Sequence, residues 1–280
     1  MKPSDAKYWF WIKLSFLFFW SNAIIQILFT SKDANLPIGI YLYIQYDFLF
    51  HGFLRYSLFL TIVLLIVFYI IEKWMVYTTF LMTLISILFI THQESEGIFY
   101  RSTSYSTILG AQFLAYFIHR LKPAFNLNYY RIQFPLQIIV ATYTLAGISK
   151  LKLSGLDWID SGKYFSLQVL KNQYFFYYDT GSEVFRTTAW TKAEWFLKNL
   201  LSIKLLLTFS LFLELFCFLA LIGKKSRISI GILLLLMHIG IYYVMGILIG
   251  GIAWNMVIFL LNPLYYFSIA FYYFRIKFIN

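Results

Sequence analysis

Charged residues are scarce in this chain. Asp, Glu, Lys and Arg together make up 12% of its 280 residues, whereas a soluble globular domain carries about 25%. Apolar residues account for 61% of the chain, and the mean hydropathy is +0.72. So few charges do not cover a globular surface. The composition therefore excludes an ordinary soluble domain and indicates an integral membrane protein.

Other absences narrow the possibilities further. The chain has a single cysteine, Cys217, which lies in an apolar run and excludes an intrachain disulfide. Acidic residues number 12 against 23 basic ones, and because the basic residues gather in short connections we read them as orientation signals and predict no nucleic-acid partner. No spacing typical of metal ligands is found, so no metal site is expected. The sequence motifs of phosphate-binding loops and of dinucleotide-binding folds are also missing.

Apolar stretches long enough, or nearly so, to cross about 30 Å of hydrocarbon recur along the chain. Spanning segments are expected to be helices, because they must satisfy their own backbone hydrogen bonds in lipid. We therefore predict an all-α integral membrane protein, a single domain over 1–280 with a bundle of about eight transmembrane helices. The first is too long for a cleaved signal and is expected to be retained. The expected spans are 8–30, 53–71, 74–91, 98–119, 131–149, 200–222, 229–249 and 252–274. Pro263 should kink the last of them.

The positions of the basic residues predict the orientation of the bundle. Arg120, Lys122 and Arg131 flank one connection, and Lys224 and Arg227 lie in another. With eight spans these connections fall on the same side as both termini, which is then the cytoplasmic side. The longest connection, 150–199, is expected to form a small extracytoplasmic cap between helices five and six. We predict a multi-pass protein of the cell membrane, the inner membrane in a bacterium, whose main partner is the lipid bilayer.

Lys150 is the most informative single residue. It ends the apolar run Leu136–Lys150, where a charge needs either an interfacial or a functional reason. The interfacial alternative is a side chain that extends to the lipid headgroups. The functional alternative is a general base, which requires a lysine that burial keeps neutral. Ala146 and Gly147 on the same helix would allow a neighbouring helix to pack closely.

Glu214 and His238 are ionisable residues inside the sixth and seventh apolar stretches. Counted from the short basic turn between these stretches, both lie at a similar depth near the middle of the bilayer. We therefore expect a hydrogen bond between the carboxylate and the imidazole. Such a pair serves either as a polar lock between helices or as a proton or cofactor site. Farther along the outer side, His92, Glu94 and Glu96 form a polar edge with no assigned role.

Two stretches of the chain resemble the HTTM family, whose best-known member is the vitamin K-dependent gamma-glutamyl carboxylase. The first stretch is AGISKL at 146–151 followed by LDWIDSG at 156–162. The second has an acidic Glu214, a basic turn that ends at Arg227, and His238 in the next helix. The resemblance covers roughly 130–263. Ser149 departs from the family pattern, which has a second lysine there, and Ser102 to Tyr105 lack the family's catalytic histidine.

The resemblance implies a carboxylase-like chemistry. Lys150 would be the base that deprotonates a vitamin K-type quinol, such as menaquinol, on the outer side of the membrane. Glu214 and His238 would be further catalytic residues, and Trp158 would contact the cofactor. A short chain leaves no room for the part with which the carboxylase holds its protein substrate. The family also includes bacterial membrane proteins that help to mature secreted peptide toxins.

Three functions therefore remain open at the level of sequence. The first is a membrane enzyme that uses a quinol and Lys150 to modify an exported peptide or a small substrate. The second is a non-enzymatic membrane partner for the maturation or export of a secreted peptide. The third is a proton-linked transporter that uses Glu214 and His238; it is the least favoured, because matched broken helices are missing from the pattern.

Overall fold

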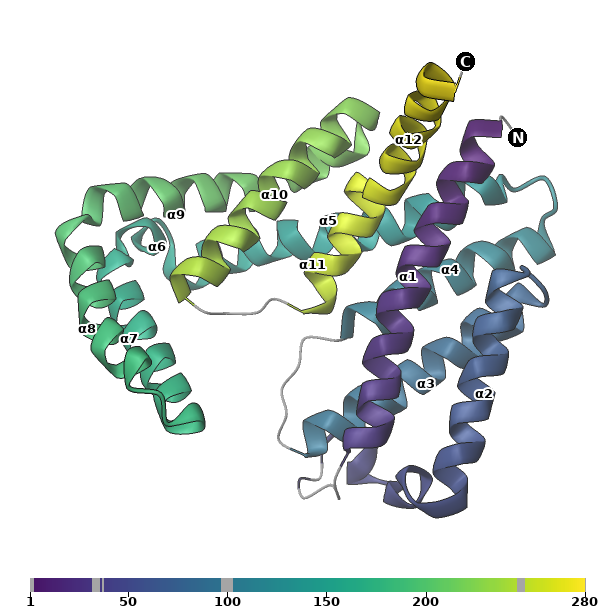
Figure 1. Ribbon diagram of the computed structural model, residues 1–280, viewed down its shortest axis with the longest axis horizontal. Coiled ribbons are helices and arrows are strands. Elements are labelled where there is room, and N and C mark those ends of the chain that lie inside the picture. The colour runs from purple at the N-terminus through teal and green to yellow at the C-terminus, as the bar shows by residue number, and fades with distance from the viewer. Residues whose placement is uncertain (1–2, 32–35, 37, 97–102, 246–249, 280) are drawn as a thin grey trace. The chain divides into compact units, whose positions relative to one another are not determined.

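The fold is all-helical in the residues that the computed structural model describes, which are 3–31, 36, 38–96, 103–245 and 250–279 (Figure 1). Long helices alternate with short helical turns, as expected for a chain with long apolar runs and few prolines. The elements are α1 (Pro3–Thr30), η1 (Gly39–Leu42), η2 (Asp47–Phe50), α2 (Gly52–Ile70), α3 (Met75–Ser95), α4 (Thr103–Leu121), α5 (Leu127–Ser154), α6 (Asp157–Asp160), α7 (Gly162–Thr180), α8 (Glu183–Lys198), α9 (Leu200–Leu215), η3 (Cys217–Leu221), α10 (Lys224–Met245), α11 (Gly251–Met256), η4 (Val257–Leu261) and α12 (Pro263–Ile279).

Several helices are long and apolar enough to cross a membrane. Among the described residues five qualify singly, namely α1, α2, α3, α5 and α10, and two bent pairs, α8 with α9 and α11–η4 with α12, raise the number to as many as seven. The remaining expected span corresponds to α4, which is long enough at 19 residues but is not among the helices that are also apolar enough. Residues 98–102 and 246–249, at one end of two expected spans, lie outside the described residues.

The outer surfaces of these helices are apolar. On α2, for example, Phe53, Tyr56, Leu60, Leu64 and Val67 are all exposed, and their spacing of three or four residues places them on one face. A soluble protein rarely exposes so large an apolar surface. Contact with the hydrocarbon of a bilayer explains this surface, in keeping with a multi-pass membrane protein.

The chain forms two compact units, 1–139 with 250–280 and 140–249, and α5 contributes its two ends to different units. In the first unit, α1 contacts α2, α3, α11 and α12. Large side chains that are fully buried fill the space between these helices. They include Trp9, Phe16, Trp20, Tyr69, Phe89 and Phe259.

The last helical region of the first unit is bent at a proline. Pro263 begins α12, and the axis turns by 42° relative to the helix before it. Asn262 adopts a left-handed conformation (φ +47°), and its amide donates to the carbonyl of Tyr8 at 3.0 Å. A proline lacks the N–H that would continue the helix, so a break before Pro263 is expected and is confirmed.

The second unit contains the helical hairpin of α7 and α8, which lie side by side (Figure 1). The side chains of Val169, Phe196, Ile203 and Leu207 form its buried core together with α9. Gly162 begins α7 against this core, where a methyl group would lie 3.3 Å from Ile203. The expected cap region, 150–199, is thus helical, with α6, α7 and α8 in place of loops.

A cluster of charged side chains is buried in the first unit. Lys13 and Arg131 are 6% and 4% exposed, and both contact the carboxylate of Glu72, at 2.9 and 3.0 Å. Trp9 donates a further hydrogen bond to Glu72, and Lys13 also donates to the carbonyl of Ile70 at 2.7 Å. Two buried cations therefore depend on one carboxylate.

The pKa of Glu72 reflects these contacts. Burial acts to raise the pKa of the Glu72 carboxyl, but the hydrogen bond from Lys13 and the charges of Arg131 and Lys13 outweigh it, so the pKa lies below its ordinary value of 4.5. A folded-state pKa below that of the unfolded chain stabilises the fold at higher pH. The contribution is lost as the pH falls below about 4.5 toward the folded-state pKa.

We therefore expect Glu72→Gln to lower the free energy of unfolding at pH 7 by about 1–3 kcal/mol, because buried donors lose their charged acceptor. The difference between wild type and variant should shrink as the pH falls from about 4.5 toward the lowered folded-state pKa of Glu72, where the wild-type carboxyl also becomes neutral. Thermal unfolding in detergent at pH 7 and pH 3.5 measures both effects. A difference that is equal at the two pH values would show that Glu72 is not the anchor of the cluster.

Candidate functional site

Lys150 and Glu214 form an ion pair in the second unit. Lys150, near the end of α5, places its ammonium nitrogen 2.6 Å from Oε1 and 2.5 Å from Oε2 of Glu214, near the end of α9. The Glu214 side chain is 7% exposed and the Lys150 side chain 24%. The carboxylate is thus buried and fully engaged, while the amine remains accessible from one side.

A glycine brings the two helices together at this point. A methyl group on Gly147 would lie 3.0 Å from the backbone nitrogen of Leu215 and 3.2 Å from Cβ of Glu214. Such contacts are tighter than most that real side chains make, so the backbone of α9 would have to move by a few tenths of an ångström to admit the methyl group. Gly147 precedes Lys150 by three residues, so the two share a face of α5. The expected close packing at Gly147 is confirmed, and it lets the Lys150 side chain reach the carboxylate.

Trp158 in α6 completes the surroundings of the amine. The Lys150 nitrogen lies 4.9 Å from the centre of the Trp158 ring, within the range of a cation–π contact. The indole nitrogen of Trp158 is buried and has no hydrogen-bond partner among the described residues. Since a buried N–H without an acceptor is costly, this donor is available to an oxygen atom of a ligand. Lys204 of α9 binds Asp160 at 2.6 Å and ties α6 to α9.

His238 of α10 is hydrogen-bonded to the phenol of Tyr143 on α5. Tyr143 precedes Gly147 by four residues and Lys150 by seven, so all three lie on one face of α5. The Nδ1 atom of His238 is buried without a partner among the described residues. The same face of α5 therefore presents two polar contacts, one to α9 and one to α10, about two helical turns apart.

The structure gives Glu214 and His238 different partners from the one that the sequence predicted. The expected carboxylate–imidazole bond was wrong, because Glu214 binds Lys150 and His238 binds Tyr143. The prediction counted depth along one straight helix over 200–222. Instead α9 ends at Leu215, is followed by the 3-10 turn η3, and meets α8 at an angle of 83°. The number of residues from the turn therefore does not give the relative depths of Glu214 and His238 in the bilayer.

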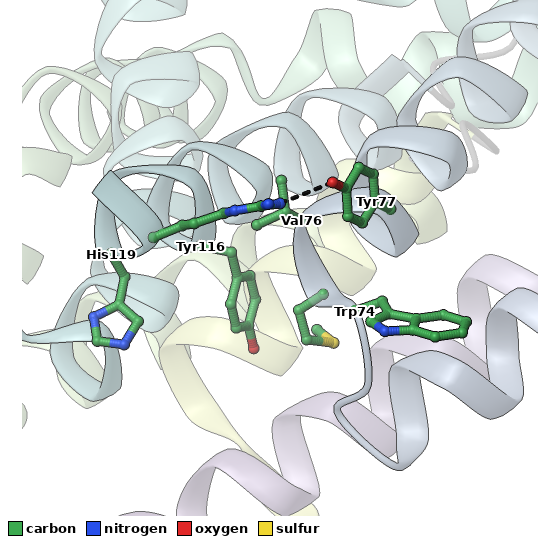
Figure 2. A pocket seen from close by; sticks show the side chains of 7 residues that line it. Trp74, Val76, Tyr77, Tyr116 and His119 are labelled. Atoms are coloured by element: carbon green, nitrogen blue, oxygen red, sulfur yellow. Dashed lines mark hydrogen bonds between the residues drawn. The ribbon is translucent and has the colours of Figure 1, made fainter. Parts of the chain in front are cut away.

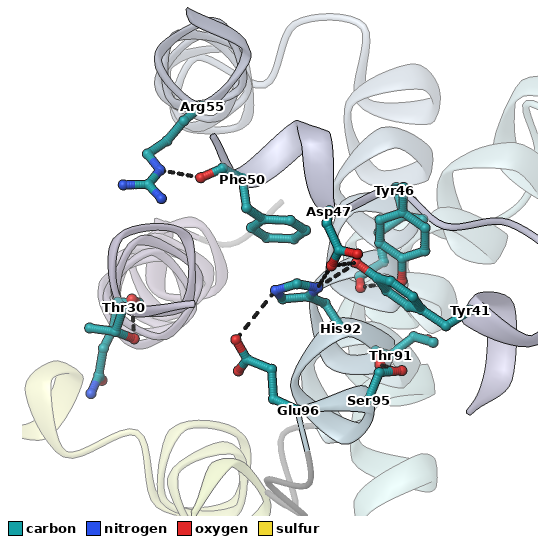
Figure 3. Close-up of polar contacts among 12 residues, drawn as sticks. Thr30, Tyr41, Tyr46, Asp47, Phe50, Arg55, Thr91, His92, Ser95 and Glu96 are labelled. Carbon is teal, nitrogen blue, oxygen red and sulfur yellow. Dashed lines mark hydrogen bonds and ion pairs between the residues drawn. The ribbon is translucent and has the colours of Figure 1, made fainter. Parts of the chain in front are cut away.

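A second polar cluster lies in the first unit around His92, which is fully buried (Figure 3). Its Nδ1 lies 2.5 Å from the hydroxyl of Tyr41, which donates to Asp47 at 2.9 Å, and its Nε2 lies 3.4 Å from Glu96. The ring stacks on Phe50 with centroids 3.8 Å apart.

The hydroxyl of Tyr41 determines which atoms of this cluster donate hydrogen bonds and which accept them. Burial raises the pKa of the Tyr41 phenol, and the hydrogen bond to Asp47 raises it further, so the phenol stays protonated. Because its one proton goes to Asp47, the Nδ1 of His92 is the donor to Tyr41. The cluster fastens η1 and η2 to the end of α3, so we regard it as a structural element.

A pocket of about 440 Å³ lies in the first unit between the start of α3 and the end of α4 (Figure 2). Arg120 lines the pocket and donates to the hydroxyl of Tyr77 at 2.9 Å. Tyr116 and His119 line the pocket from α4, and Trp74 lines it from the residue before α3. None of the residues predicted from the sequence as catalytic lies here.

Comparisons with known proteins add no relative: no family model, no curated protein and no solved structure matches the chain. Metal-binding geometry is likewise not found in the described ranges, where no three His, Cys, Asp or Glu side chains converge. On geometry alone, the Lys150–Glu214 pair with Trp158 is the strongest candidate site in the second unit.

We expect Gly147→Ala to lower the free energy of unfolding by about 1–3 kcal/mol, the usual cost of overpacking, because the new methyl group pushes α9 away from α5. Gly240→Ala is the matched control, since that glycine lies in α10 with open space around it. The control should leave stability unchanged or raise it by up to about 1 kcal/mol. Equal effects of the two substitutions on thermal unfolding would contradict the close approach at Gly147.

Proposed function

We propose that this chain is a membrane enzyme in which the Lys150–Glu214 pair accepts a proton from a vitamin K-type quinol, and that it modifies an exported peptide or a small substrate. The observation that carries the proposal is the contact of one partly accessible amine with both oxygens of a buried carboxylate, at 2.6 and 2.5 Å. The resemblance of 146–162 to the HTTM family supports the choice of quinol.

The pair is suited to take up a proton. As an ion pair, or as a neutral amine beside a carboxylic acid, the two groups together carry no net charge, and low polarity brings these forms closer in energy. In the second form the lone pair of Lys150 is a base. Uptake of a proton raises the charge of the pair from zero to +1. That charge stabilises the negative charge which forms on the donor oxygen.

The neighbouring residues fit a quinol. A reduced vitamin K-type quinol supplies two acidic hydroxyl groups and two reducing electrons. The unpartnered N–H of Trp158 suits one of its oxygens, and the aromatic face of Trp158 suits a flat ring. Tyr143 continues the polar face of α5, and its partner His238 lies on α10; the two provide a further hydroxyl and an imidazole for proton movement.

The proposed topology places this chemistry on the outer side. We count eight spans: the five single helices, α4, the segment of α9 and η3, and the bent pair of α11–η4 with α12. Both termini and the basic connection 119–131 are then cytoplasmic. Lys150, near the far end of α5 from that connection, then lies toward the outer leaflet. Residues 157–198 form the proposed extracytoplasmic cap, and an exported peptide is accessible there.

The proposal is tested by anaerobic titration of the purified protein with reduced menaquinone, with deprotonation followed by the long-wavelength absorbance of the quinol. Wild type should bind and deprotonate it. Lys150→Met should lose deprotonation, and Lys150→Arg should lose it too, because arginine keeps the ion pair but does not give up its proton. Lys152→Met is the matched control, an exposed lysine on the same helix, and should behave as wild type.

Two results would contradict the proposal. If Lys150→Arg deprotonates the quinol as well as wild type does, Lys150 serves only as an ion-pair partner. If mass spectrometry of the purified protein finds a stably bound peptide and wild type binds no quinone, the non-enzymatic role in peptide maturation is the better account.

A further inference from the structure

We propose that the pocket between the start of α3 and the end of α4 binds the headgroup of an anionic phospholipid, whose acyl chains lie along the apolar surface of the same two helices. This site belongs to the first unit, shares no residue with the Lys150–Glu214 site and does not depend on its function. It requires only that the chain spans a membrane.

The charge of the pocket favours an anion. Its lining contains Arg120 and His119 and no acidic residue. A guanidinium carries five N–H donors, and within the described residues Arg120 uses one of them on Tyr77, so others remain for phosphate oxygens. The Nδ1 of His119 donates to the carbonyl of Phe125 at 3.0 Å, which fixes the ring at the edge of the pocket.

The nearest connections strengthen this positive field. The segment 119–131 contains two further basic residues, Lys122 and Arg131, and no acid. Arg131 lies close enough to the Tyr116 phenol in the pocket wall to interact with it electrostatically. Glu72, the acid in the connection before α3, is already bound by Lys13, Arg131 and Trp9. The carboxylate that could repel a phosphate is therefore neutralised.

Aromatic residues place the pocket at headgroup depth. Trp74 and Tyr77 border it and expose 60% and 56% of their surface, although both are large and mostly apolar. Tryptophan and tyrosine prefer the interface between hydrocarbon and water, where the ring is in an apolar layer and the polar atom is hydrated. Basic pockets between membrane helices at this depth are suited to acidic lipid headgroups.

An apolar strip leads from the pocket toward the middle of the membrane. Phe80 of α3 packs against Phe113 of α4, with ring centroids 5.4 Å apart, and Phe113 stacks on Phe117 at 5.6 Å. Phe80 and Phe117 are exposed, as are Leu81 and Leu114 on the same two helices. A pocket with basic side chains that continues into an exposed apolar strip matches a lipid, whereas a free phosphate would use the pocket alone.

The test measures lipid binding by native mass spectrometry, with the full chain purified in detergent and titrated with phosphatidylglycerol, phosphatidylcholine or inorganic phosphate. We expect wild type to bind one phosphatidylglycerol in preference to phosphatidylcholine. Arg120→Gln should weaken phosphatidylglycerol binding by about tenfold or more, as expected when a hydrogen bond to a charged group is lost. Lys122→Gln removes the same charge from the same connection outside the pocket and should weaken binding by no more than about fivefold, the general effect of one cation.

Three results would overturn the proposal. Equal weakening by Arg120→Gln and Lys122→Gln would mean that lipid is attracted by general charge and not by the pocket. Equal binding of phosphatidylcholine and phosphatidylglycerol would remove the selectivity for an anionic headgroup. Protection against thermal unfolding by inorganic phosphate as large as that by phosphatidylglycerol would identify a free-anion site in place of a lipid site. Quinol deprotonation should be unchanged in Arg120→Gln, so this site and the Lys150–Glu214 site are tested separately.

Discussion

The contact between an amine and a buried carboxylate organises the second unit. Glu214 is nearly excluded from solvent, and a carboxylate in that position is costly unless a partner offsets its charge. Lys150 is the partner, and it reaches Glu214 only because Gly147 lets α9 approach α5 closely. Loss of the lysine would leave the buried carboxylate without the cation that offsets its charge. The same partial exposure of the amine makes a chemical role possible.

The first unit also pairs buried charges, but there the cations outnumber the carboxylate. There one carboxylate, Glu72, holds two buried cations, Lys13 and Arg131, which belong to helices far apart in the sequence. Acidic residues are the less common charge in this chain, and in both units one of them, Glu72 or Glu214, binds basic residues from other helices. Charge pairing between helices therefore helps to fix the arrangement of the helices within each unit, and the Lys150–Glu214 pair remains partly accessible.

The sequence was a good guide wherever local physics decides the outcome. The helical class, the break before Pro263 and the close packing at Gly147 follow from backbone chemistry and apolar runs, and all three are confirmed. The number of helices that cross the membrane is less readily predicted, because α4 is only marginally apolar and α8 and α9 are bent by 83°. The orientation of the chain in the membrane and the roles of the site residues remain predictions.

Side-chain pairing was the part that the sequence did not predict. Glu214 was matched with His238 by depth along straight helices, whereas helix breaks and tilts bring it to Lys150. The buried Lys13 was also missed, although a lysine deep within a long apolar helix is itself a signal of a buried partner. Pairs of this kind depend on how separate helices approach one another, and that information lies in the packing of many residues and not in any local motif.

A double-mutant cycle on Lys150 and Glu214 tests the central claim most directly. The free energies of unfolding of wild type, Lys150→Met, Glu214→Gln and the double variant give the energy of interaction between the two side chains. A contact as close as the one seen here predicts a coupling of about 1–3 kcal/mol, with the double variant more stable than the sum of the single losses implies. A coupling indistinguishable from zero would contradict the pairing on which the candidate site is built.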